Sequence, residues 1–245
     1  METSTIIQKL KLPEKGSKLI KSLLAGQPPA RNVRNGKNYI SRNPSAKNKC
    51  TIQAESTLEQ CVCYKLEYDC EVVRFWDQPE TFSKLPKYIR KDGKYGSNPI
   101  TPDFLVLKKD EVLIIEVKPQ DKIFEYINSK SEMYYCLPDG NFSSEPAEQL
   151  FNEYGFHYKI ITDKNLDFTF INNVKFLSKF KFTTFSQNTK EWALQLIREG
   201  HVKYLSDLLD SAIKKRINCD EIYSLISNNI IVVDLFCRIL SKPEL

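Results

Sequence analysis

The sequence predicts a mixed α/β protein with a helical C-terminal domain. Two apolar runs, residues 103–107 and 112–118, lie on either side of a four-residue polar turn, as expected of an antiparallel hairpin. Stretches before and after this hairpin repeat their apolar residues with helical spacing. Strands interspersed with helices predict a mixed sheet flanked by helices.

Composition bounds the class of protein. The chain has 245 residues, 41% hydrophobic and 27% charged, enough for one core and a smaller second unit. No run of about 18 apolar residues is present, and the N-terminus lacks the pattern of a secretory signal. The seven cysteines are irregularly spaced, without a Cys-x-x-Cys pair. We therefore expect a soluble, cytoplasmic protein without disulfides, a zinc site or a membrane partner.

The first 50 residues form the most basic part of the chain. They hold eleven Lys or Arg and two Glu, a net charge of +9, whereas residues 51–245 carry −4. Prolines and glycines interrupt this segment, and only residues 17–24 favour a short helix. We expect a basic, mostly irregular arm over 1–50 that binds DNA, the alternative being a solubilising tail. Its candidate DNA-binding residues are Arg31, Arg34, Lys37, Arg42, Lys47 and Lys49.

Residues 51–168 are expected to form the central domain. Ser56 or Glu55 can begin its first helix, and Pro119 ends the second hairpin strand because proline has no N–H for a ladder. The predicted elements are a helix over 54–69, a strand over 72–79, the hairpin at 103–118, a helix over 146–156 and a strand over 157–163.

Residues 169–245 are expected to form a separate C-terminal domain. Three helical patterns cover 182–200, 204–216 and 219–229, and an apolar strand is predicted at 230–234, before a last helical segment. This order is typical of a small winged-helix-like unit. A helical cap on the central domain fits the pattern equally well.

The hairpin also carries the residues of a candidate catalytic site. Side chains alternate along a strand, so Glu116 and Lys118 share a face, and the pairing brings Asp103 beside Glu116. Asp103 and Glu116 offer the hard oxygen ligands that Mg²⁺ prefers, and Glu59, from the preceding helix, can complete the metal sphere. Lys118 can orient the attacking water and offset transition-state charge. The alternative is a solvated strand end with a weak ion pair.

This pattern predicts phosphodiester hydrolysis. Bound Mg²⁺, which Mn²⁺ can replace, would activate water. Two such ions about 4 Å apart, as we expect here, would together stabilise the attacking and leaving oxygens.

Three further features are weaker. Gln78 can end a strand or contact phosphate, Tyr95 and Trp76 can stack on a base, and the basic residues 214–216 can contact phosphates or simply end a helix.

Ordered motifs across residues 31–165 resemble TnsA, the endonuclease subunit of heteromeric transposases, which has a restriction-endonuclease-like PD-(D/E)xK core. The similar segments are Arg42–Lys47, Glu55–Glu59, Val73–Pro79, Thr101–Leu105, Glu116–Pro119 and Ile161–Asp163.

The resemblance implies a catalytic set of Glu59, Asp103, Glu116 and Lys118, in a family that tolerates Gln at the position of Glu116. It implies cleavage of the 5′ strands of double-stranded DNA at transposon ends, in the prokaryotic cytoplasm at the nucleoid. It also implies two partners, a DDE recombinase (TnsB-like) and an AAA+ regulator (TnsC-like). Two alternatives stay open: a stand-alone restriction or repair nuclease, and a non-catalytic DNA- or protein-binding adaptor.

Overall fold

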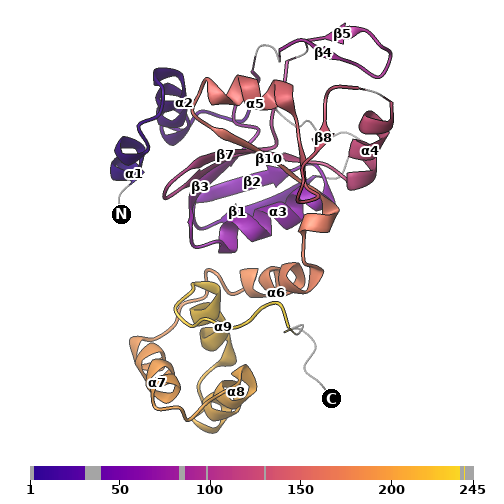
Figure 1. Cartoon of the computed structure of the whole chain (residues 1–245). Coiled ribbons are helices and arrows are strands. Elements are labelled where there is room, and N and C mark those ends of the chain that lie inside the picture. Colours follow the sequence, from indigo (N-terminus) through magenta and orange to yellow (C-terminus); the bar gives the residue numbers. More distant parts are fainter. Residues whose placement is uncertain are drawn as a thin grey trace. The chain divides into compact units, whose positions relative to one another are not determined.

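The computed structural model describes residues 3–30, 40–82, 86–97, 99–129, 131–237 and 240. The chain divides into two compact units, Met1–Leu166 and Asp167–Leu245. All strands of the described chain belong to the first unit, and the second is helical in its described part (Figure 1). Within these ranges, no helix is long and apolar enough to cross a membrane. The predicted mixed α/β class with a helical C-terminal region is confirmed.

The first unit is built on a four-stranded mixed sheet with the order β10-β7-β6-β3. The predicted hairpin is confirmed, since β6 and β7 pair antiparallel with Phe104 opposite Ile115. β3 pairs antiparallel with β6, and β10 lies parallel to β7. The strand bounds are Val72–Asp77 for β3, Phe104–Lys108 for β6, Val112–Val117 for β7 and His157–Ile161 for β10.

Helices cover both faces of this sheet (Figure 1). On one face lie α3 (Thr57–Tyr68) and the hairpin of β1 (Ser41–Ser45) and β2 (Cys50–Ala54). On the other lie α2 (Glu14–Leu24) and α5 (Glu145–Asn152). Side chains point alternately to the two faces of a sheet. Because the central strands carry apolar residues on both faces, both faces must be covered by other elements.

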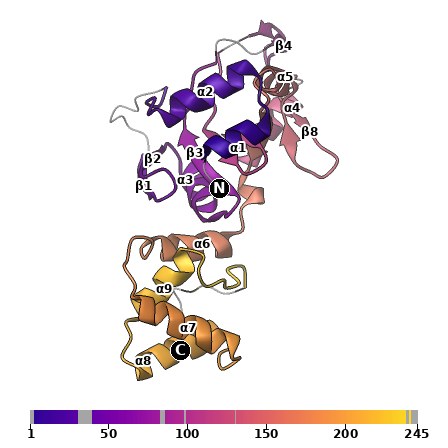
Figure 2. The same cartoon turned by 90° about the vertical axis from the view of Figure 1, so that its left-hand side faces the viewer.

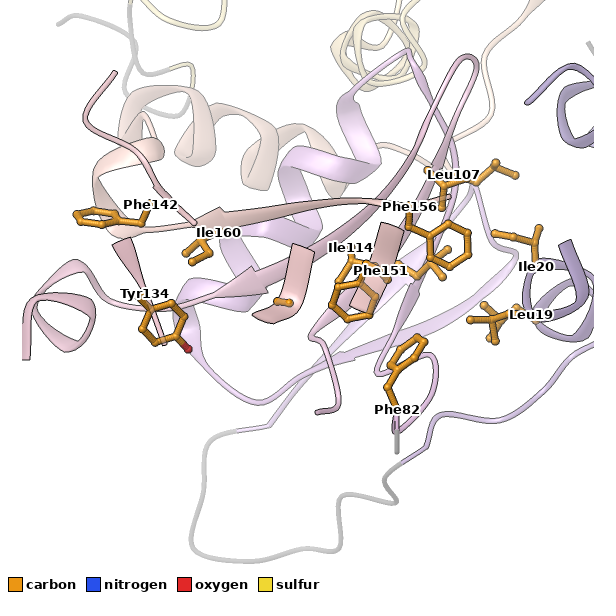
Figure 3. Close-up of a cluster of buried hydrophobic side chains, with 14 of the residues drawn as sticks. Leu19, Ile20, Phe82, Leu107, Ile114, Tyr134, Phe142, Phe151, Phe156 and Ile160 are labelled. Atoms are coloured by element: carbon orange, nitrogen blue, oxygen red, sulfur yellow. The ribbon is translucent and has the colours of Figure 1, made fainter. Parts of the chain in front are cut away.

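The larger apolar cluster lies between the sheet and α2, α4 and α5. Figure 3 shows Leu19 and Ile20 of α2 facing the side chains of Leu107 and Phe156. Phe82 meets the edge of Phe151, with ring centroids 4.9 Å apart. α4 (Gln120–Asn128), which the polar sequence after Pro119 concealed, adds one fully buried residue. The remaining short elements are β4 (Tyr88–Ile89), β5 (Tyr95–Gly96), β8 (Tyr135–Cys136), β9 (Phe142–Ser143) and η1 (Asp163–Asn165).

The predicted irregular arm is wrong for most of its described residues. α1 (Thr3–Leu10) and α2 pack on the first unit (Figure 2), and β1 and β2 form a hairpin against α3. Ile6 and Ile20 are fully buried, so these helices exist because their few apolar residues complete a core supplied by distant strands. Gly16 permits the close approach, since a Cβ there would lie 2.0 Å from the Tyr154 carbonyl oxygen.

The second unit contains four helices in its described part: α6 (Phe168–Ser178), α7 (Gln187–Arg198), α8 (Leu205–Lys214) and α9 (Cys219–Ser227). The sequence predicted the last three. The strand predicted at 230–234 is wrong, because this run follows α9 without pairing. Ile231 of this run packs instead: its side chain is buried, and its N–H donates to the Leu225 carbonyl near the end of α9.

Ile20→Ala tests whether α2 belongs to the folded unit. Removing this fully buried side chain should lower the free energy of unfolding by about 2–5 kcal/mol, as for other core truncations. Urea unfolding followed by circular dichroism measures the change. Lys18→Ala, on the exposed side of the same helix, is the matched control and should stay within about 0.5 kcal/mol of the wild type. Equal stability of both variants would mean that α2 does not contribute to the core.

Candidate active site

The Asp103 carboxylate joins the open ends of β6 and β7. Its Oδ2 accepts the Val117 N–H at 2.6 Å, just beyond the last main-chain pair of the hairpin. On the other side, the Asp103 carbonyl accepts the Gln78 N–H at 2.9 Å. Asp103 is thus tied to the neighbouring strands on both sides. The predicted approach of Asp103 to the Glu116–Lys118 segment is confirmed.

Glu116 is held by three donors. Its Oε1 accepts from Lys118 Nζ at 2.5 Å and from the Tyr134 hydroxyl at 2.7 Å, while Oε2 accepts from the Tyr158 hydroxyl. Lys118 Nζ also donates to the Tyr134 hydroxyl oxygen at 2.6 Å. The contact between Glu116 and Lys118 confirms that the two side chains share a face. Together these groups form a closed hydrogen-bond network.

The two tyrosines of this network were not predicted from the sequence. Tyr158 lies on β10, which pairs with β7 so that Tyr158 is opposite Ile114. That register puts Tyr158 on the same face as Glu116, two residues along β7. Periodicity could have placed Tyr158 on one face of a strand, but not beside β7. Tyr134 precedes a two-residue strand and carries no sequence signal that we can identify.

Glu59 approaches from the N-terminus of α3. Ser56 caps this helix, as predicted, and accepts the Glu59 N–H at 3.1 Å. The Glu59 carboxylate returns the interaction, accepting the Ser56 hydroxyl and the Glu55 N–H, both at 2.8 Å. These hydrogen bonds satisfy polar groups at the start of α3 and alone would explain a Glu at this position. Its negative charge is close enough to act on Asp103.

The carboxylates differ in how well their charge is stabilised. Burial, together with the nearby Glu59 and Glu116 charges, raises the pKa of Asp103 to about 8, and the Val117 N–H and Lys118 only partly oppose this. Glu116 is buried too, which by itself raises its pKa. Its net pKa is nevertheless lowered, because Lys118 and the two tyrosine hydroxyls outweigh burial. The site thus contains one well-stabilised anion and one carboxyl that holds its proton near neutral pH.

The acids of the site are oxygen donors of the kind that a hard metal ion prefers. Among the described residues, no three His, Cys, Asp or Glu side chains gather closely enough to hold one. Each predicted ligand instead accepts hydrogen bonds from the protein. The chemistry of the set does fit a hard cation, because positive charge would offset both the burial and the repulsion that raise the pKa of Asp103. Metal binding therefore requires exchange of protein donors for the ion.

Gln78 lies between Glu55 and Asp103. Its backbone adopts φ +40°, a left-handed conformation that costs a residue other than glycine about 1–3 kcal/mol. The side chain is buried, with Nε2 donating to the Glu55 carboxylate. Within the described chain, Oε1 is buried without a hydrogen-bond partner. Gln78 therefore does more than end β3: it links the strand that bears Asp103 to the start of α3.

The candidate DNA-binding residues of the arm have different surroundings. Arg31, Arg34 and Lys37 lie outside the described residues. Arg42 and Lys49 are exposed on the β1–β2 hairpin. Lys47 instead stabilises the fold, because its Nζ donates to the carbonyls of Asp69 and Val72.

Comparison with known proteins adds no assignment. The sequence matches no protein-family model, and no curated protein matches it.

Asp103→Asn tests the electrostatics of the site without an activity assay. Between about pH 4 and 8 the unfolded chain has lost the Asp103 proton while the folded protein retains it, so this group makes stability fall as pH rises, by up to about 1.4 kcal/mol per pH unit. Asparagine cannot ionise and can still accept the Val117 N–H. The variant should be more stable than the wild type at pH 7.5 and about equal at pH 4, by urea unfolding. A constant difference across this range would contradict the raised pKa.

Proposed function

We propose that the protein is an Mg²⁺-dependent DNA endonuclease with Asp103, Glu116, Lys118 and Glu59 as its catalytic set. One observation carries the proposal: the ends of β6 and β7 bring two acids and a lysine together in a half-buried site, with a third acid acting on it from α3. Acids buried beside one another are costly unless a cation joins them, and such costs are typical of functional sites.

Asp103 and Glu116 would hold the ion, with Glu59 beside them. When bound, Mg²⁺ would lower the pKa of a coordinated water and neutralise charge on the phosphoryl oxygens. Asp103 would then give up its proton, because an adjacent cation stabilises the carboxylate. Mn²⁺ has the same preference for oxygen ligands and would substitute.

Lys118 is the cation of this site that the protein itself supplies. Its Nζ contacts Glu116 and the Tyr134 hydroxyl and lies 4.8 Å from the centroid of the Tyr134 ring. These contacts hold a flexible side chain in one place, which lowers the entropic cost of using it. An ammonium group fixed there can donate to a phosphoryl oxygen or to the attacking water. Tyr134 and Tyr158 are positioning residues in this scheme.

The biological setting rests on the resemblance of the ordered motifs to TnsA. We propose that the protein cuts the 5′ strands at transposon ends, together with a DDE recombinase and an AAA+ regulator. The same proposal includes a PD-(D/E)xK fold for the sheet and its helices. It also includes a winged-helix-like role for the second unit. A stand-alone nuclease would use the same residues but would not need the partners.

Asp103→Ala should reduce strand cleavage by about 10³-fold or more, since removing a metal ligand costs several kcal/mol of transition-state stabilisation. Nicking of end-labelled transposon-end duplexes in Mg²⁺ measures this, with and without the two partners. Asp110→Ala, in the exposed β6–β7 turn, is the matched control and should cut at the wild-type rate. Full activity of Asp103→Ala would remove Asp103 from the site. Equal wild-type cutting without partners would favour a stand-alone nuclease.

Metal binding should release protons near neutral pH, because Asp103 is largely protonated in the free protein and the ion displaces its proton. Isothermal titration with Mg²⁺ at pH 7, in buffers of different ionisation enthalpy, gives the number of protons released. We expect about one proton for the wild type and close to none for Asp103→Asn. Binding enthalpies that are the same in all buffers for the wild type would contradict this linkage.

A further inference from the structure

A basic β-hairpin lies next to the candidate site. Residues 86–97 include β4 and β5 and hold four Lys or Arg and one Asp, a net charge of +3. The hairpin projects from the first unit in both views (Figures 1 and 2). Its exposed basic residues are Lys87, Arg90, Lys91 and Lys94. We propose that this hairpin binds the phosphate backbone of duplex DNA beside the cut site, a role that rests on the proposed nuclease function.

Hydrogen bonds fix the hairpin to the segment that holds Tyr134. The Glu132 N–H donates to the Ile89 carbonyl at 2.9 Å, and the Ser131 hydroxyl donates to the same carbonyl at 3.0 Å. In return, the Ile89 N–H donates to the Glu132 carboxylate at 3.1 Å. Tyr134, two residues on, contacts both Glu116 and Lys118. These hydrogen bonds therefore connect the base of the hairpin to the segment that contacts the candidate site.

One aromatic ring connects the two basic regions. Lys91 Nζ lies 3.9 Å from the centroid of the Tyr126 ring, and Lys118 Nζ lies 5.8 Å from the same centroid. The Tyr126 ring also meets the edge of Tyr134 at 5.3 Å between centroids. Lys91 of the hairpin and Lys118 of the site therefore both lie at the Tyr126 ring. A DNA backbone with one phosphate at Lys118 would have Lys91 within reach of a neighbouring phosphate.

Charge explains why such a neighbour is needed. The acids of the candidate site outnumber its one lysine, so without metal the site repels a polyanion. Lys87 and Lys94 have no acidic partner among the described residues and are available to phosphates. Arg90 pairs only with exposed Asp92, at 3.5 Å, and Lys91 with exposed Glu125, at 3.6 Å. Exposed pairs of this kind are weak and exchange readily for phosphate contacts.

The hairpin is shaped to present these side chains. Gly93 turns the chain with φ +75°, and a Cβ on Gly96 would lie 2.7 Å from Arg90 Cδ. Next to Gly96, the Tyr95 side chain is 73% exposed. A ring so placed can pack against a sugar or a base at the edge of a groove. Basic residues around an exposed aromatic ring are typical of nucleic-acid contacts.

Lys87→Gln combined with Lys94→Gln tests the proposal in the full-length protein. Fluorescence anisotropy with a 30-base-pair duplex, in Ca²⁺ to hold cleavage back, gives the affinity across a range of NaCl concentrations. Losing two phosphate contacts should reduce the slope of log affinity against log salt by about 1.8. The affinity at low salt should fall about tenfold or more.

Lys159→Gln combined with Lys164→Gln is the matched control. It removes the same charge from exposed residues of the same unit, outside the basic segment 1–50. Its salt slope should change little, and melting curves should show that both double variants fold. An equal loss in both variants would mean diffuse attraction by net charge and would overturn the proposal. An unchanged hairpin variant would overturn it too and would point to a protein partner for this surface.

The same experiments separate the hairpin from the nuclease assignment. If the wild-type protein binds DNA through the hairpin but never cuts in Mg²⁺ with its partners, the proposed nuclease function is wrong and the hairpin remains a DNA contact. If the wild type cuts and the hairpin variant binds and cuts equally well, only the hairpin proposal is wrong.

Discussion

The hydrogen bond from the Val117 N–H to the Asp103 carboxylate is the contact on which the candidate site depends. The β6–β7 ladder could have continued with main-chain pairs, but a side chain takes the next place. This substitution holds an acid in the plane of the sheet where two more functional side chains emerge. Because Gln78, directly after β3, donates its N–H to the Asp103 carbonyl, Asp103 cannot move without disturbing the ends of three strands.

Around that contact, the two carboxyl groups are stabilised to very different degrees. Glu116 has donors for both oxygens and is stable as an anion, whereas Asp103 has one N–H donor and two acidic neighbours. Gln78 adds a strained backbone and an unsatisfied oxygen next to them. Costs of this kind are tolerated where a site must accept a ligand that the free protein lacks. The rest of the first unit, with its apolar cores on both faces, supplies the stability that offsets them.

The sequence predicted features that depend on residues close together in the chain, and it missed features that depend on distant residues. The β6–β7 hairpin, the Ser56 cap and the sharing of a face by Glu116 and Lys118 are local, and they were predicted correctly. A short helix over 17–24 was predicted and is part of α2, but α1 and the packing of both helices were missed because the core they complete comes from strands 80 or more residues away. Tyr134 and Tyr158 were missed for the same reason, since only the pairing of β10 with β7 and the docking of residues 131–134 bring them to Glu116. At 230–234 an apolar run was mistaken for a strand, because an apolar run by itself does not specify a pairing partner.

The network around Glu116 also determines what a substitution at this position would cost. Each of its oxygens accepts a hydrogen bond from a hydroxyl or an ammonium group. A glutamine could keep its oxygen toward Lys118 and Tyr134, while its NH₂ group would face the Tyr158 hydroxyl, which would then have to accept instead of donate. The exchange is therefore compatible with both tyrosines, but it removes the anion beside Lys118 and weakens the charge-assisted hydrogen bonds of the network.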